Sequence, residues 1–127
     1  MKYSVSIDVP LLEDGLRFYR DALGLAEIAR PVATYVTLKC GDSQIGLIEK
    51  SAGSKPAEGS DDIRRYERHW TPVHIDFHVD DFETFLAKAV SAGAKCERKF
   101  EGGGARPPIA FCSDPFGNGF CVTGPIA

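Results

Sequence analysis

The sequence predicts an α+β fold in which two tandem βαβββ modules form a curved sheet around a cleft. Two observations carry this prediction: an internal repeat, and in each copy a strand-like pattern followed by a helix-like one. The stretch "SVSIDVPLLEDGL", from residue 4, aligns with "HIDFHVDDFETFL", from residue 74. The 127 residues suit one such domain, made of module 1 (residues 1–50), a linker (51–71) and module 2 (72–127).

Each copy of the repeat opens with a strand, because apolar and polar residues alternate strictly over six positions. The apolar face carries Val5, Ile7 and Val9 in the first copy and Ile75, Phe77 and Val79 in the second. The opposite face carries Ser4, Ser6 and Asp8 in the first copy and His74, Asp76 and His78 in the second.

A helix follows each of these strands, since apolar residues recur there at helical spacing. They are Leu12, Leu16, Tyr19 and Leu23 in module 1, and Phe82, Phe85, Leu86 and Val90 in module 2. Gly24 and Gly93 end the two helices. Three shorter strands then complete each module, at about 25–30, 33–40 and 43–49 and at about 95–99, 108–113 and 119–124.

The linker is too polar to form part of a core, although its segment "DDIRRYER" is typical of a short helix with Ser60 as its cap. A connection of this length is usually functional or flexible. Two interpretations stay open: a solvated linker, or a lid over the site.

One helix covers only one face of a four-stranded sheet, so the polar face of each module must meet the other module or a second chain. Two such faces opposite each other would make a cleft, where small-molecule sites usually occur.

Composition argues against several classes of partner. The net charge of −3, with Lys and Arg scattered, gives no reason to expect nucleic acid or an anionic membrane. No apolar stretch approaches the roughly 20 residues that span a bilayer. This, with an N-terminal "MKYSVSIDVP" that lacks the apolar core of a signal peptide, predicts a cytoplasmic protein. The four cysteines form no C-x-x-C pair and are expected to be free thiols in such a reducing compartment.

Three motifs, "LRFYRDALGL", "PVHIDFHVDDFE" and "CSDPFGNGFCV", together with the duplicated modules, resemble the vicinal oxygen chelate superfamily. This superfamily includes glyoxalases, bleomycin-resistance proteins and extradiol dioxygenases. The resemblance covers nearly the whole chain and implies the glyoxalase/bleomycin-resistance-like fold, but the motifs do not distinguish the branches.

The resemblance also implies where a metal would bind, because metal-using members take one ligand, commonly His or Glu, from the first and the last strand of each module. In this sequence those positions hold Ser4, Gly46, His74 and Cys121. Only His74 has the expected identity, since Gly46 has no side chain and Ser4 is a poor ligand for the usual divalent ions. No cofactor is therefore expected.

A degenerate metal site remains an alternative. Residues two apart on a strand lie about 6.6 Å apart and can share an ion, whereas residues four apart lie roughly 13 Å apart and cannot. His74, Asp76 and Cys121 could thus form a three-ligand site for a divalent metal, while His78 is expected to be exposed or structural. His74 beside Asp76 could also act as a general acid-base pair, with His74 the first candidate for a catalytic residue and Asp76 the second.

The strand order implied by the resemblance predicts the residues that line the cleft. They are Ser4, Ser6, Tyr35, Thr37, Gln44 and Gly46 from module 1, and His74, Asp76, Phe111 and Cys121 from module 2. Trp70, the single tryptophan, either closes one wall or packs in a core. Aromatic walls with few charges suit a planar or moderately hydrophobic ligand.

Three hypotheses for function follow. The first is a small-molecule-binding protein without the usual metal site. The second is an enzyme, a lyase or dioxygenase of the glyoxalase line, that uses His74, Asp76 and Cys121. The third is an association module with a vestigial cleft. A homodimer is expected in each case, because each module exposes a sheet face and strand edges.

Overall fold

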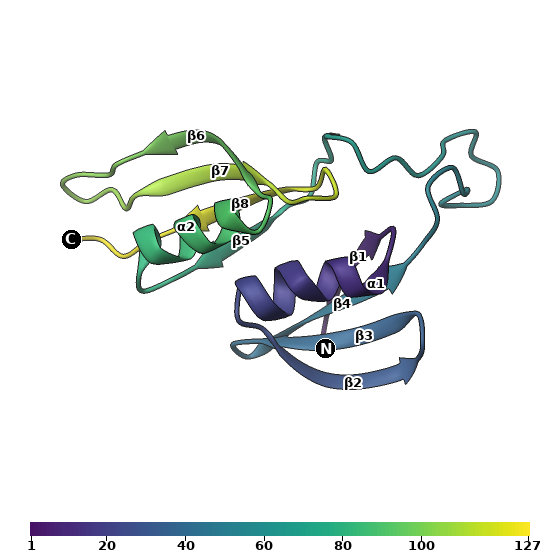
Figure 1. The fold of residues 1–127 in the computed structure, drawn as a ribbon. Helices are drawn as coiled ribbons and strands as arrows, with labels where there is room; N and C mark the ends of the chain where they lie inside the picture. The colour runs from purple at the N-terminus through teal and green to yellow at the C-terminus, as the bar shows by residue number, and fades with distance from the viewer. The chain divides into compact units, whose positions relative to one another are not determined.

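The chain forms two compact units, each built around its own four-stranded sheet. A computed structural model describes residues 1–127, and its contacts divide them into Met1–Tyr66 and Glu67–Ala127. Each unit holds one sheet and one helical segment, as Figure 1 shows. The predicted α+β class with two βαβββ modules is therefore confirmed. The cleft predicted between the modules stays a prediction.

Module 1 contains four strands in the order β1-β4-β3-β2. The strands are β1 (Val5–Val9), β2 (Ala26–Val32), β3 (Tyr35–Cys40) and β4 (Ser43–Glu49). The first strand is parallel to the last, and the other pairs are antiparallel. Between β1 and β2 the chain forms the helix α1 (Leu12–Leu16), which continues as the π-helical segment η1 (Arg17–Ala22).

The core of module 1 forms where the helical segment covers the sheet. All four predicted helix positions, from Leu12 to Leu23, are buried. Phe18 is buried as well, and its ring meets the Tyr19 ring edge to face at 4.9 Å. Both residues lie in the π-helical segment, whose wider turn departs from the regular spacing on which the sequence pattern rests. The sequence pattern therefore found Tyr19 and missed Phe18.

Module 2 repeats the same topology, with the strand order β5-β8-β7-β6. Its strands are β5 (Ile75–His78), β6 (Lys95–Phe100), β7 (Ile109–Ser113) and β8 (Gly119–Thr123). Again the first and last strands are parallel and the others antiparallel. The internal repeat read from the sequence is thus a repeat of topology.

The helix α2 (Phe82–Ser91) begins at Asp81, whose side chain accepts a hydrogen bond from the backbone N–H of Thr84 at 3.1 Å. Phe82 and Leu86 are buried as predicted. Val90 was predicted on the same apolar face but is 46% exposed, so that prediction is wrong. Val90 stands in the last turn of the helix, where Ala89 faces the core in its place.

Each sheet buries one face against its helix, and we call the opposite face the open face. The side chains that point toward the helix are buried: Ile7, Val9, Val36, Leu38, Ile45 and Leu47 in module 1, and Phe77, Ala110, Cys112, Phe120 and Val122 in module 2. Their sequence neighbours alternate onto the open face. All predicted lining residues that lie within strands are on this face.

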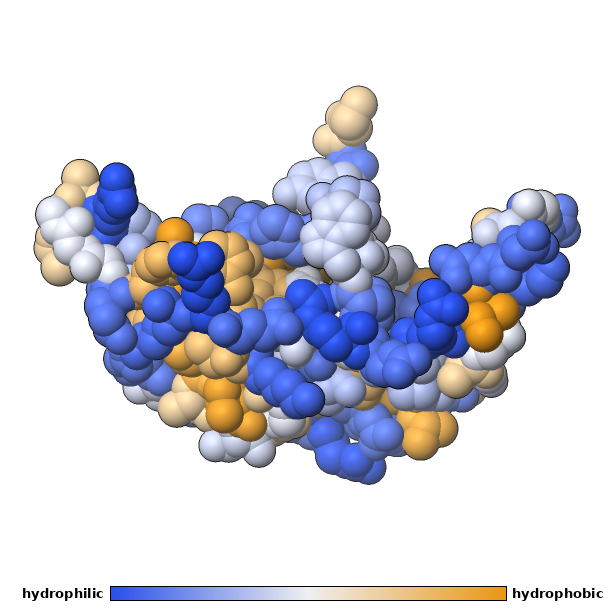
Figure 2. Space-filling model, turned by 90° about the horizontal axis from the view of Figure 1, so that it is seen from above, coloured by the Kyte–Doolittle hydropathy of each residue, from blue (hydrophilic) through white to orange (hydrophobic).

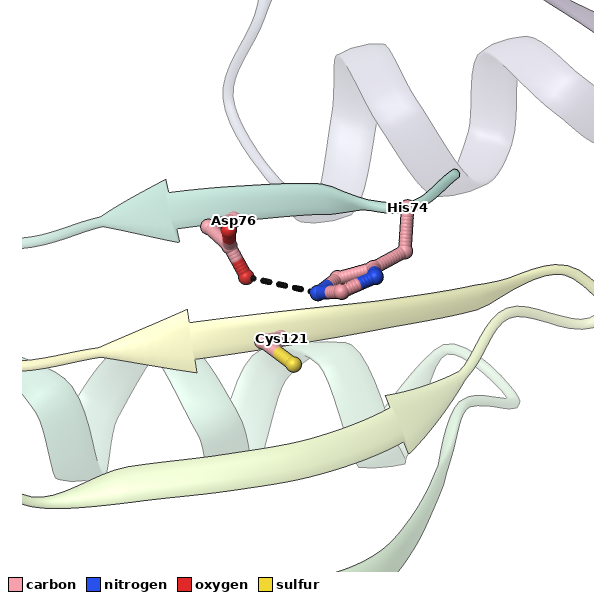
Figure 3. A group of neighbouring side chains, drawn as sticks. All are labelled: His74, Asp76 and Cys121. Carbon is pink, nitrogen blue, oxygen red and sulfur yellow. Dashed lines mark ion pairs between the residues drawn. The ribbon is translucent and has the colours of Figure 1, made fainter. Parts of the chain in front are cut away.

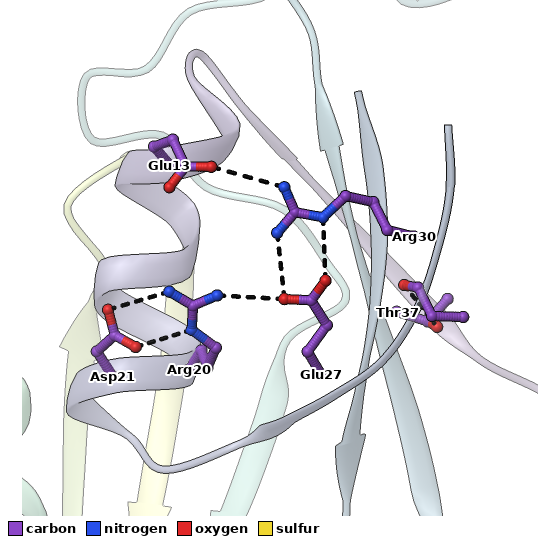
Figure 4. A network of polar contacts seen from close by, with 7 residues as sticks. Glu13, Arg20, Asp21, Glu27, Arg30 and Thr37 are labelled. Atoms are coloured by element: carbon purple, nitrogen blue, oxygen red, sulfur yellow. Dashed lines mark hydrogen bonds and ion pairs between the residues drawn. The ribbon is translucent and has the colours of Figure 1, made fainter. Parts of the chain in front are cut away.

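A polar network joins the helical segment of module 1 to β2 (Figure 4). Arg20 contacts Asp21 and Glu27, and Arg30 contacts Glu27 and Glu13. These side chains are exposed or partly exposed, so solvent screens the pairs and they contribute little to stability. They connect the helical segment to the edge strand β2.

The predicted short helix in the linker is wrong, because residues 61–68 form no helix. Their backbone is engaged across the loop instead: Arg64 N–H donates to Ser54 O at 2.9 Å, and Gly53 N–H donates to Arg64 O at 2.8 Å. The Arg64 guanidinium donates to Asp8 of β1 at 2.7 Å and to Lys55 O at 2.8 Å. The linker is thus bound to module 1 rather than freely solvated over this stretch.

The following residues of the linker bind to module 2 at the turn between β7 and β8. Arg68 makes two hydrogen bonds to Glu97, at 2.9 and 3.0 Å, and contacts the carbonyl of Gly117 at 3.3 Å. His69 Nε2 lies 2.9 Å from the side-chain oxygen of Asn118. The boundary between the compact units, after Tyr66, falls between these two bound stretches.

The surface is mixed in hydropathy, with hydrophobic areas separated by hydrophilic ones (Figure 2). The large exposed hydrophobic side chains include Trp70, Val73, Phe100 and Phe111. No helix combines the length and the apolar character that a membrane span requires.

The close approach at the β7–β8 turn generates a prediction about Gly117. This residue has φ +84°, and a β-carbon there would overlap the carbonyl group of Glu67. Gly117→Ala should lower the free energy of unfolding by roughly 1 to 3 kcal/mol, measured by urea denaturation. Gly104→Ala is the matched control, since Gly104 also has a positive φ but no atom near its β-carbon position. An equal loss of unfolding free energy in the two variants would show that the packing of residues 67–69 against Gly117 contributes nothing to stability.

Candidate functional site

Three potential ligand side chains converge on the open face of module 2. The parallel pairing of β5 with β8 places Asp76 directly opposite Cys121. His74 precedes Asp76 by two residues and therefore projects from the same face. One ligand atom from each of the three side chains lies within 4.8 Å of the other two, and Figure 3 shows them pointing toward one another. The predicted three-residue cluster is thus present in the structure.

Asp76 is the centre of this cluster. Its Oδ1 atom lies 3.2 Å from His74 Nε2, and both side chains are about half exposed, at 51% and 49%. Burial, together with the charge of Asp76 and a hydrogen bond to it, raises the pKa of the Cys121 thiol to about 11. At neutral pH the thiol is therefore protonated. It is a weak nucleophile in this state, because the thiolate is the reactive form.

His78 does not belong to the cluster, although it lies on the same strand. It is exposed, and the group of converging ligand atoms does not include it. Residues four apart on a strand are too far apart to share an ion, so the sequence predicted that His78 would not join His74 in one site. The structure agrees with this prediction.

The matching positions of module 1 cannot supply the same chemistry. Ser6 pairs with Gly46 on the parallel strands β1 and β4, just as Asp76 pairs with Cys121. A β-carbon on Gly46 would lie 2.8 Å from Tyr35 Cε2 and 3.1 Å from both Ser6 Oγ and Tyr35 Oη. The ring of Tyr35 thus lies over the place that a side chain at position 46 would occupy.

The metal site of the metal-using relatives therefore does not fit this chain as a whole. Of its four positions, Gly46 offers no donor atom and is covered by Tyr35, and Ser4 offers only a hydroxyl. Module 2 alone keeps donors suited to a divalent ion. The residues that would hold such an ion are His74, Asp76 and Cys121.

The other predicted lining residues lie outside the three-residue cluster, and Thr37 pairs directly with Gly46. Thr37 donates a hydrogen bond to Ala29 O at 3.4 Å, and Gln44 is an exposed residue paired with Lys39. Ser4 is exposed just before β1. Trp70 is 79% exposed, so it does not pack in the core of module 2. Whether these residues line a ligand site stays a prediction.

Sequence reasoning missed two residues beside the cluster. Phe111 pairs with Cys121, as expected of a lining residue, but Arg98 pairs with Phe111 in turn. Phe100 follows Arg98 on the same face, and its ring lies 4.6 Å from the Arg98 guanidinium carbon. The alternation in "KCERKF" contained this signal, since residues 98 and 100 share one face of a strand.

The comparison with family models decides the family. Residues 4–123 match the glyoxalase-like domain. The chain belongs to this family. It is accordingly a member of the vicinal oxygen chelate superfamily that the sequence motifs resemble. No curated protein matches the chain.

Solved structures similar to this glyoxalase-like domain share its fold. A lactoylglutathione lyase from Agrobacterium tumefaciens is 17% identical, with 98% of this chain and 92% of that chain covered and a TM-score of 0.64. A fosfomycin resistance protein, FosX, from Listeria monocytogenes is 12% identical, with 98% and 93% covered and a TM-score of 0.72. A glyoxalase/bleomycin resistance protein from Albidiferax ferrireducens is 18% identical, with 96% of both chains covered and a TM-score of 0.67.

The position of Asp76 generates a prediction about the reactivity of Cys121. Asp76→Asn removes the negative charge beside the thiol, so the pKa of Cys121 should fall, although burial should still hold it above its ordinary value. The pH midpoint for alkylation of Cys121 by iodoacetamide, followed by peptide mass spectrometry, should move to lower pH. Asp80→Asn is the control, because Asp80 is an exposed carboxylate beyond the end of β5. An unchanged midpoint in Asp76→Asn would mean that burial alone sets this pKa.

Proposed function

We propose that this glyoxalase-like protein binds a moderately hydrophobic or aromatic small molecule without the metal of its metal-using relatives. The observation that carries the proposal is the packing of Tyr35 over Gly46. The module 1 position that would carry a metal ligand has lost its side chain, and an aromatic ring has taken the space. Position 46 therefore offers no polar side chain, and the Tyr35 ring presents an apolar surface there. Such a surface favours a ligand with aromatic or apolar character.

The chemistry of module 2 supports the same proposal. A metal would have to displace the proton of the Cys121 thiol, whose raised pKa of about 11 opposes this at neutral pH. His74 and Asp76 are paired with each other and half exposed, which suits hydrogen bonding to a ligand. In this proposal the ligand binds on the open face of module 2, where His74 and Asp76 are its polar contacts.

We further propose that the protein is a cytoplasmic homodimer. All four cysteines are free thiols, which suits a reducing compartment. Each sheet has two edge strands, β1 and β2 in module 1 and β5 and β6 in module 2, and one face that its own helix does not cover. Sedimentation velocity over a range of protein concentrations measures the assembly, and a monomer at all concentrations would contradict it.

A metal titration tests the proposal directly. Protein freed of metal by chelation is titrated with zinc, nickel, manganese and ferrous iron in an isothermal calorimeter. We expect no stoichiometric submicromolar complex, because only module 2 brings three potential ligands together. The comparison of His74→Ala with His78→Ala identifies the site, since the two histidines stand just before and at the end of β5 but only His74 is in the cluster. A submicromolar complex lost in His74→Ala and kept in His78→Ala would overturn the proposal.

A second candidate function rests on the convergence of His74, Asp76 and Cys121 within 4.8 Å. It is a lyase or dioxygenase of the glyoxalase line in which these residues hold a divalent metal. When bound, the metal would act as a Lewis acid on a substrate oxygen. His74 and Asp76 could alternatively move a proton as a general acid-base pair without any metal.

An assay of turnover separates this candidate from simple binding. A thiohemiacetal and a catechol are the test substrates, chosen to represent the lyase and the dioxygenase reaction. Turnover that is abolished by chelation, restored by one metal and lost in Cys121→Ala would establish the metal enzyme. Turnover that persists after exhaustive chelation would exclude it and would favour the acid-base pair, which His74→Gln should then abolish.

A further inference from the structure

An exposed patch of two aromatic rings and one arginine lies beside the cluster of module 2. We call it the Arg98 patch, and it consists of Arg98, Phe100 and Phe111. The rings of Phe100 and Phe111 meet edge to face with their centroids 6.0 Å apart. They are 43% and 41% exposed, although both are large apolar side chains. Exposed aromatic rings gathered on one sheet face are typical of a binding surface.

The charge on Arg98 has no acidic partner in the structure. Its two neighbours along β6 are both engaged: Glu97 pairs with Arg68, and Lys99 pairs with Glu83 and Glu101. Arg98 alone makes no ion pair, and its guanidinium lies over the Phe100 ring instead. An arginine that stacks on a ring in this way keeps its N–H donors free for a planar anion.

The patch is continuous with the proposed site. Pairing across four strands sets Asp76, Cys121, Phe111 and Arg98 in one row on the open face. With strands about 4.8 Å apart, the backbone at Arg98 lies roughly 10 Å from that at Cys121. A ligand of two aromatic rings spans this distance, so it can lie over Phe111 with one end at Arg98 and the other near Cys121.

The charges at the two ends of the row are opposite and set the orientation of such a ligand. Asp76 would repel an anionic group, whereas Arg98 would attract it. We propose that the open face of module 2 binds a planar aromatic anion, such as an aromatic carboxylate or sulfonate. Its anionic group contacts Arg98, its rings pack on Phe111 and Phe100, and its uncharged end points toward Cys121 and His74. This inference rests on the proposed function and names its class of ligand.

A matched pair of fluorescent probes tests the inference. Anilinonaphthalene sulfonate is a planar aromatic anion, and phenylnaphthylamine is the same molecule without the sulfonate. We expect the native protein to bind the sulfonate more tightly than the uncharged probe. Arg98→Gln should weaken binding of the sulfonate about tenfold and leave phenylnaphthylamine unchanged within about twofold. Arg98→Lys should restore part of the loss, because it keeps the charge and loses the planar fork.

Arg106→Gln is the matched control. It removes the same charge from the exposed turn between β6 and β7, where Arg106 pairs with Gly103, and should change the binding of neither probe. Phe111→Leu should weaken both probes, since it removes the ring on which they pack. Circular dichroism melting curves show whether each variant keeps its fold.

The outcomes separate the two proposals. If neither probe binds the native protein, both the proposed function and this inference are contradicted. If both probes bind and Arg98→Gln leaves their affinity ratio unchanged, the inference is wrong and the proposed function stands. If Arg98→Gln changes the sedimentation coefficient and not the ratio, the patch is covered by another protein chain and the inference is again wrong.

Discussion

The parallel pairing of the first and last strands of each module is the constraint on which the site depends. In a βαβββ unit the helix covers one face of the sheet, and this parallel pair sets two side chains opposite each other on the open face. The registers are equivalent, with Ser6 opposite Gly46 in module 1 and Asp76 opposite Cys121 in module 2. A shift of one residue would turn His74 and Asp76 toward the helix, where no buried charge is tolerated without a partner.

Because the registers match, the two modules differ in chemistry and not in geometry. Module 2 fills the paired positions with a carboxylate and a thiol, whereas module 1 fills them with a hydroxyl and a glycine under an aromatic ring. The glycine at position 46 and the packing of Tyr35 depend on each other, since a larger residue at position 46 would overlap the ring. The cluster of potential ligands is thereby confined to module 2.

The sequence predicted the elements well where alternation or helical spacing was strong. The strand 75–78, the buried residues Leu12 and Leu16, and the association of His74, Asp76 and Cys121 all followed from period and register. The linker was not predictable in this way. In its helix-like segment the Arg64 backbone bonds to Gly53 and Ser54 across the loop, and the Arg64 guanidinium reaches Asp8, which is 56 residues away in the sequence. Phe18 and Val90 were misjudged because both lie where the helix departs from its regular period or ends.

Asp76 decides what module 2 can bind. Its carboxylate lies 3.2 Å from His74 Nε2, and its negative charge adds to burial in raising the pKa of the Cys121 thiol. A cation held by all three side chains would have to displace the thiol proton, whereas an anion would be repelled by the Asp76 carboxylate. The cationic end of the open face lies instead at Arg98, on the far side of Phe111. A ligand with an anionic group at one end and aromatic rings in the middle can pair with Arg98 and keep its negative charge away from Asp76. Neither a metal ion nor a neutral ligand meets both conditions.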